Sequence, residues 1–185
     1  MRIAGTDESG RGPIAGPVFA AAVILDPTKP IIGLNDSKKL SKIQLDKFYK
    51  KIIEDSLSWS VSCASVKEIE VLNILNASLL AMKRSVLGLK LRPDEVIIDG
   101  KFILDLDIKM RAEVKADTKF NQVMAASILA KVSRDKYMLD LDKKFPFYGF
   151  KNHKGYPTKQ HLEAIELKGI CMHHRKTFKP ILKYL

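Results

Sequence analysis

The chain has 185 residues, of which 46% are hydrophobic and 29% are charged. This composition fits one globular domain with its own core, and no uninterrupted apolar stretch is long enough to span a membrane. The formal net charge of +11 says nothing about fold, but it indicates a polyanionic partner; the alternative is a protein that its lysines keep soluble.

The first predicted element is a β-hairpin. Residues 2–6 and the apolar residues 18–25 form its strands, and its turn contains the stretch DESGRGP at residues 7–13. Because successive residues of a strand point to opposite faces, Asp7 and Glu8 can share a site only if the strand ends there. Two carboxylates beside two glycines and an arginine predict a cation site next to an anion site, and a solvated turn is the alternative.

Two helices with a strand between them are predicted next. Ser41 and Gln44 have the spacing of a capping box before the first helix, and Ser65 and Glu68 have it before the second. At residues 57–63 the apolar side chains alternate with serines, which predicts a strand whose apolar side is buried.

Two further acids stand at the ends of predicted elements. The apolar run at residues 95–98 ends in Asp99, and a buried strand that ends in an acid is where an α/β sheet usually presents functional groups. Residues 108–114 predict another strand, which Asp117 follows. Together with the two acids of the hairpin, these side chains offer the oxygen ligands that Mg²⁺ prefers. Taken alone, Asp117 would be an ordinary helix cap.

The remainder of the chain is predicted to be mostly helical. A long helix is expected at residues 121–142, and Thr158 can cap a shorter helix that stops at Gly169. Five strands with helices between them predict one α/β domain over residues 1–185, with a helical C-terminal portion from about residue 145.

Seven short blocks of sequence, spread over almost the whole chain, together form a recognisable pattern. These blocks are DESGRGP at 7–13, DSKKL at 36–40, DG at 99–100, AASILAK at 125–131, RD at 134–135, HKGY at 153–156 and HR at 174–175. In type and order these blocks resemble the ribonuclease HII family. The resemblance implies an RNase H-like fold with a central mixed sheet flanked by helices, and a C-terminal portion that binds substrate.

The same resemblance implies an activity. Members of the family are endonucleases that hydrolyse the RNA strand of RNA–DNA hybrids with Mg²⁺ or Mn²⁺. They also incise duplex DNA on the 5′ side of a single embedded ribonucleotide, leaving 3′-hydroxyl and 5′-phosphate ends. This chain is therefore expected to act in ribonucleotide removal from DNA.

Residue roles follow by position from this resemblance. Two ions would share four ligands, which are Asp7, Glu8, Asp99 and Asp117, and Asp7 is expected to bridge both. Gly10, Arg11 and Gly12 match the element that senses the ribose 2′-hydroxyl, which distinguishes RNA from DNA. Tyr156 matches the tyrosine that stacks on the sugar of the following deoxynucleotide. Five basic residues are expected to contact phosphate or to be structural, and they are Lys38, Lys39, Lys131, Arg134 and Arg175.

Two positions depart from the family pattern. Ser9 replaces a small apolar residue, which a turn tolerates. Ala116 stands where the family usually has glycine, so the placement of Asp117 depends on how the backbone runs at a residue that disfavours positive φ. The related ribonuclease HIII is disfavoured, because it lacks the glycine-arginine-glycine element and has an extra N-terminal domain.

Other interpretations of the same residues are possible. A non-catalytic, basic nucleic-acid-binding module is the alternative function, and its acids would be structural. A zinc site at Cys171, His173 and His174 matches no standard zinc spacing. Cys63 and Cys171 form no CxxC pair, and with no signal-peptide pattern this predicts a cytoplasmic protein without disulfides. A monomer without an obligate protein partner is expected.

Overall fold

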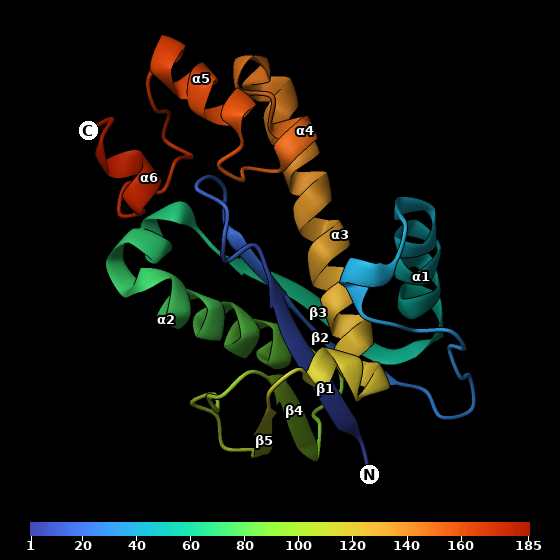
Figure 1. Cartoon of the computed structure of the whole chain (residues 1–185). Helices are drawn as coiled ribbons and strands as arrows, with labels where there is room; N and C mark the ends of the chain where they lie inside the picture. Colours follow the sequence, from blue (N-terminus) through green and yellow to red (C-terminus); the bar gives the residue numbers. More distant parts are fainter.

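The computed structural model describes residues 1–185, and its centre is a mixed five-stranded sheet (Figure 1). The strands are β1 (Ile3–Ser9), β2 (Val18–Leu25), β3 (Ser56–Ala64), β4 (Glu95–Asp99) and β5 (Lys109–Glu113). Their order across the sheet is β3-β2-β1-β4-β5. The central strand β1 pairs antiparallel with β2 and parallel with β4, so the sheet is mixed, as predicted.

Three helices cover the two faces of the sheet, and they are α1 (Lys42–Asp55), α2 (Val66–Leu87) and α3 (Asn121–Lys144). Three shorter helices follow, α4 (Phe150–His153), α5 (Lys159–Lys168) and α6 (Lys179–Leu182). On one face lies α2, whereas α3 lies on the other with α1 beside it (Figure 1). The short helices α4 to α6, orange and red in Figure 1, gather near the end of α3. None of the helices has the length and apolar character needed to cross a lipid bilayer.

Both predicted capping boxes are present. The Ser41 hydroxyl accepts from the backbone N–H of Gln44, whose side chain accepts from the backbone N–H of Ser41. Ser65 and Glu68 form the same reciprocal pair. These bonds satisfy N–H groups that have no partner inside the helix, which is why α1 and α2 begin at the expected residues.

The apolar core has a layer on each face of the sheet, and a further cluster lies among the C-terminal helices and the end of α3. Ala22 of β2 packs with Ile69 of α2 in one layer, whereas its neighbour Ala21 packs with Ile128 of α3 in the other. This division follows from the alternation of side chains along a strand. Because β2 and α3 are rich in alanine, helix and sheet pack closely, which holds β1 and its acids against α3.

The predicted burial of β3 is wrong. The strand forms as expected, but Leu57 and Trp59 are 43% and 36% exposed, whereas Ser58 is 3% exposed. β3 is an edge strand, and its serine side packs under the end of α2, where a Cβ on Gly88 would lie 2.4 Å from Oγ of Ser60. Only small side chains fit between helix and strand at such a distance, so the larger residues take the less covered face.

Candidate active site

The register of the central strands brings two acids to one edge of the sheet. β1 and β4 are parallel and pair Thr6 with Ile98, so Asp7 and Asp99 follow next to each other at the carboxyl ends of their strands. Glu8 comes directly after Asp7, near the end of β1. The prediction that the first strand ends at these residues is wrong, because β1 continues to Ser9 and both acids are paired with β2. Asp7 and Glu8 nevertheless line the same cavity at this edge of the sheet.

Asp117 reaches the same edge through a short 3-10 turn (Ala116–Thr118) after β5. The left-handed residue of this connection is Lys115, with φ of +59°, and not Ala116. Ala116 is fully buried, and its backbone N–H donates to Oδ1 of Asp99 at 2.7 Å. The departure from glycine at position 116 therefore leaves the path of the backbone to Asp117 intact, and a backbone hydrogen bond ties the two acidic segments together.

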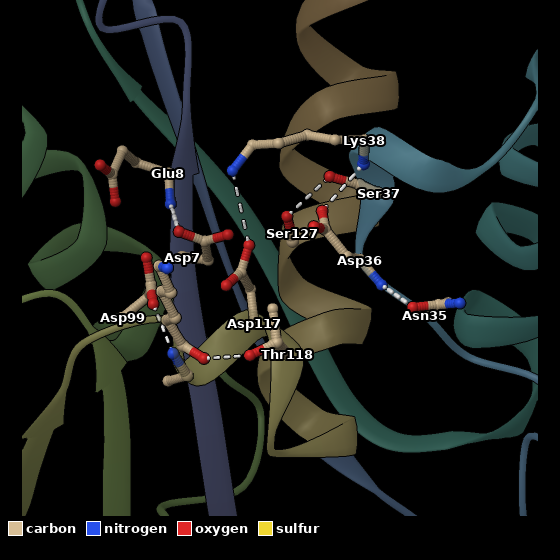
Figure 2. A network of polar contacts seen from close by, with 12 residues as sticks. Asp7, Glu8, Asn35, Asp36, Ser37, Lys38, Asp99, Asp117, Thr118 and Ser127 are labelled. Atoms are coloured by element: carbon tan, nitrogen blue, oxygen red, sulfur yellow. Dashed lines mark hydrogen bonds and ion pairs between the residues drawn. The ribbon is translucent and has the colours of Figure 1, made fainter.

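These carboxylates share one cavity of about 220 Å³. Figure 2 shows them approaching the same space from β1, from β4 and from the turn before α3. The predicted ligands lining it are Asp7, Glu8, Asp99 and Asp117. Residues more than 100 positions apart in the sequence thus meet in the fold.

Crowding raises the pKa of two of the carboxyls. The pKa of Asp7 is raised well above its ordinary value, first because the group is buried and then because Glu8 and Asp99 are close. Burial and then the charge of Asp117 raise the pKa of Asp99. A positive charge approaches from one side, where Nζ of Lys38 lies 3.7 Å from Oδ2 of Asp117 (Figure 2). A cation bound among the carboxylates would relieve this repulsion.

The residues present fit a divalent cation. Oε2 of Glu8 is buried and has no hydrogen-bond partner, which is costly for a carboxylate oxygen. Hard cations such as Mg²⁺ and Mn²⁺ prefer oxygen ligands of this kind. The structure contains no group of three His, Cys, Asp or Glu side chains already gathered to hold one ion. Mg²⁺ usually keeps several of its waters, so a cation in this cavity can be held through water as well as by the carboxylates directly.

The turn after β1 lies beside this cavity. Gly10 lines the cavity and has φ of +97°, a conformation that favours glycine. Arg11 is exposed, and its Nη1 lies 3.3 Å from Oε1 of Glu8. A Cβ on Gly12 would lie 3.3 Å from Cε1 of Tyr156, which also lines the cavity. The structure thus brings the turn and Tyr156 together next to the acids.

Comparisons with known proteins decide the family. The family model described as Ribonuclease HII matches residues 4–181. A protein named ribonuclease HII from Chromobacterium violaceum is 54% identical over 186 residues, with 100% of this chain and 94% of that protein covered. Another from Shewanella amazonensis is 50% identical over 184 residues, covering 100% and 89%. The chain belongs to the ribonuclease HII family.

A solved structure agrees with this assignment. The ribonuclease H2 from Pyrococcus horikoshii superposes with a TM-score of 0.82 at 29% sequence identity, covering 100% of this chain and 97% of that one. The RNase H-like fold expected from the sequence is therefore confirmed. As a ribonuclease HII the chain is an enzyme, a metal-dependent ribonuclease H that cleaves RNA in RNA–DNA hybrids.

The basic residues of this ribonuclease HII separate into two groups. Lys38 and Lys131 line the cavity, whereas Lys39 is exposed outside it. Arg134 and Arg175 are 1% and 0% exposed, and their guanidinium groups donate to backbone carbonyls of the turn after β1. Of the two roles that the sequence leaves open, burial favours the structural one for both arginines.

Two residues of the cavity carry no distinct signal in the sequence. The hydroxyls of Ser37 and Ser127 lie 3.0 Å apart, and both residues line the cavity (Figure 2). The side chain of Ser127 lowers the pKa of Asp7 and so opposes the larger effect of burial on that carboxyl. Ser127 can donate to Asp7 only if Ser37 donates to Ser127. Their position inside two of the family-like blocks is the only hint of this role in the sequence.

Proposed function

We propose that this ribonuclease HII incises duplex DNA on the 5′ side of a single embedded ribonucleotide, as well as cleaving RNA in longer hybrids. We further propose that it uses two divalent cations, Mg²⁺ or Mn²⁺, with Asp7, Glu8, Asp99 and Asp117 as ligands. The supporting observation is one cavity lined by all four carboxylates, with a glycine-rich turn and an exposed tyrosine at its side.

Each part of this site has a physical task. The carboxylates hold the cations, which when bound supply the Lewis acidity that activates water and stabilises the leaving 3′ oxygen. Gly10 and Gly12 present backbone without side chains, so a ribose can come close enough for its 2′-hydroxyl to be read. Tyr156, 46% exposed, offers a ring face to the neighbouring sugar. Lys38 and Lys131, which line the cavity, would contact the phosphates of a bound strand.

The proposal is tested with a DNA duplex that contains one internal ribonucleotide. We expect one nick, 5′ of the ribonucleotide, with 3′-hydroxyl and 5′-phosphate ends, when Mg²⁺ or Mn²⁺ is present. EDTA should abolish it, and an all-DNA duplex should stay intact. Cleavage of a long hybrid without any nick at the single ribonucleotide would refute the incision activity, and binding without cleavage of either substrate would favour the non-catalytic binding module.

Arg11→Ala is expected to lower the rate of cleavage at a single ribonucleotide by about 10- to 100-fold, the equivalent of one hydrogen bond that involves a charged group. Affinity for an all-DNA duplex should change much less, because many other basic residues hold phosphates. Single-turnover cleavage and fluorescence anisotropy measure the two quantities. Lys47→Ala, which removes one charge from the exposed side of α1, is the matched control. Equal losses of rate and affinity in Arg11→Ala would exclude a sensing role for this side chain.

A further inference from the structure

The segment before α6 contributes a buried arginine to the turn after β1. Arg175 is 0% exposed. Its Nη2 donates to the carbonyl of Gly10 at 2.7 Å, its Nη1 to the carbonyl of Arg11 at 3.0 Å, and its Nε to the carbonyl of Gly16 at 2.8 Å. One rigid guanidinium therefore holds both ends of the turn.

Arg175 has no carboxylate partner, which is unusual for a buried cation. Burial is costly for an unpaired charge, and here the dipoles of the three carbonyls offset that cost, together with the ring of Phe178, whose centroid lies 5.1 Å from Cζ of Arg175. The carbonyls therefore have to stay in the fork of the guanidinium. A lysine could not reproduce this contact, since its donors leave from a single nitrogen.

The neighbouring residue, His174, begins a chain of hydrogen bonds that ends on Tyr156. The backbone N–H of Cys171 donates to Nδ1 of His174 at 2.9 Å, so the proton of this ring is on Nε2. That Nε2 lies 3.0 Å from Nε2 of His161, which must accept. The remaining nitrogen of His161, Nδ1, then donates to the backbone carbonyl of Tyr156 at 2.9 Å. Both rings are fully buried, and their tautomers follow from these partners.

The two sets of contacts are joined by backbone pairing. The N–H of Arg175 donates to the carbonyl of Ile14 at 2.8 Å, and the N–H of Ile14 donates to the carbonyl of Gly155, next to Tyr156, at 2.8 Å. A Cβ on Gly155 would lie 2.6 Å from the carbonyl oxygen of Ala15, so the two backbone segments lie too close for a side chain at position 155. In Figure 1 the turn (blue) reaches toward the red C-terminal segment.

We propose that His174 and Arg175 are positioning residues that fix the separation between the turn at residues 10–12 and Tyr156. Arg175 acts on the turn directly, and His174 acts on Tyr156 through His161. This inference rests on the proposed function, in which the turn reads the ribose and Tyr156 the following deoxyribose. A fixed separation then selects the junction between the two sugars, whereas inside a continuous RNA strand only the turn has a sugar to read.

Arg175→Lys tests the proposal. We expect kcat/KM at a single ribonucleotide to fall by about 100-fold, the usual result of misplacing substrate by about 1 Å. Cleavage within a continuous RNA–DNA hybrid should fall by less than about 10-fold, so the ratio of the two rates changes. Tyr184→Phe is the matched control: it loses a 3.2 Å hydrogen bond to Oε1 of Glu166 in the same C-terminal portion without touching the turn, His161 or His174. It should lower both rates together, if at all.

His161→Gln is the second variant, in case Arg175→Lys does not fold. Glutamine can still accept from His174 but loses the bond to the Tyr156 carbonyl, so it should also lower the ratio of rates. Hydrogen–deuterium exchange of the backbone at residues 10–14 and 154–158 gives a readout that does not depend on cleavage, and faster exchange in either variant is expected.

A rate ratio like that of the wild type, or unchanged exchange in both segments, would overturn the positioning role. A wild-type enzyme that does not nick at the single ribonucleotide would refute the proposed function instead. Hydrogen–deuterium exchange would still test whether His174 and Arg175 hold the two segments in place.

Discussion

Asp7→Asn is expected to lower kcat by about 10³-fold, because it removes the central carboxylate of the cavity, and ligation of catalytic metal ions contributes several kcal/mol to the stabilisation of the transition state. Affinity for the substrate should stay within about threefold, since phosphate contacts supply most of it. Single-turnover cleavage with saturating enzyme and binding in EDTA measure the two effects. Asp46→Asn makes the same change of charge at an exposed position of α1 and should behave as wild type.

Retention of a tenth or more of the wild-type kcat by Asp7→Asn would contradict a role for Asp7 as a shared metal ligand. A parallel loss in Asp46→Asn would attribute the effect to net charge and not to the cavity.

Without metal, the same substitution is expected to stabilise the protein. The pKa of Asp7 is raised in the folded state, so the folded protein holds this proton more tightly than the unfolded chain does. Stability is therefore lost as the pH rises from the ordinary aspartate pKa through the raised one. In EDTA at pH 7 the Tm of Asp7→Asn should exceed that of the wild type, and the difference should shrink toward pH 4. A lower Tm for Asp7→Asn at pH 7 would show that the buried charge of Asp7 does not destabilise the metal-free protein.

Gly5→Ala is expected to reduce the free energy of unfolding by about 3 kcal/mol, the upper end of the usual cost of overpacking. Gly5 lies on β1 two residues before Asp7, and a Cβ there would lie 2.4 Å from the backbone carbon of Gln122 and the backbone nitrogen of Val123. These atoms belong to the first turn of α3 and cannot move aside as a side chain can, so β1 and α3 would have to separate. Urea unfolding measures the loss.

Gly149→Ala is the control for this prediction. Gly149 is left-handed, with φ of +73° and ψ of +30°, and a Cβ there would first meet Nε2 of Gln160, the end of a flexible side chain, at 2.8 Å. Only backbone strain of about 1–2 kcal/mol is therefore added. If Gly149→Ala costs as much as Gly5→Ala, the contact between β1 and α3 is not the reason for glycine at position 5.

Much of the fold is readable from local patterns. The capping boxes at Ser41 and Ser65 mark helix starts because their bonds join residues three apart and need no tertiary partner. The side of β3 that is buried was not predictable in this way. It depends on how closely α2 passes over Ser58 and Ser60, and that distance is a property of two elements and not of one.

Local patterns likewise predict some residues of the site and not others. Asp7 and Asp99 stand at the ends of apolar runs, so their position at a strand edge follows from sequence. Their convergence with Asp117 depends on the parallel pairing of β1 with β4 and on the left-handed Lys115, neither of which a local pattern specifies. A buried arginine such as Arg175 is equally hard to predict, because an arginine in a basic chain is read first as a surface contact to phosphate.

The contacts of Arg175 also bear on how the enzyme matures. The guanidinium binds carbonyls that lie 159 to 165 positions earlier in the chain. A ribosome therefore has to release almost the whole polypeptide before the N-terminal turn gains its support, and contacts at such separation close late in folding. The four acids of the cavity lie within the first 117 residues, so they are synthesised well before Arg175 can hold the turn beside them.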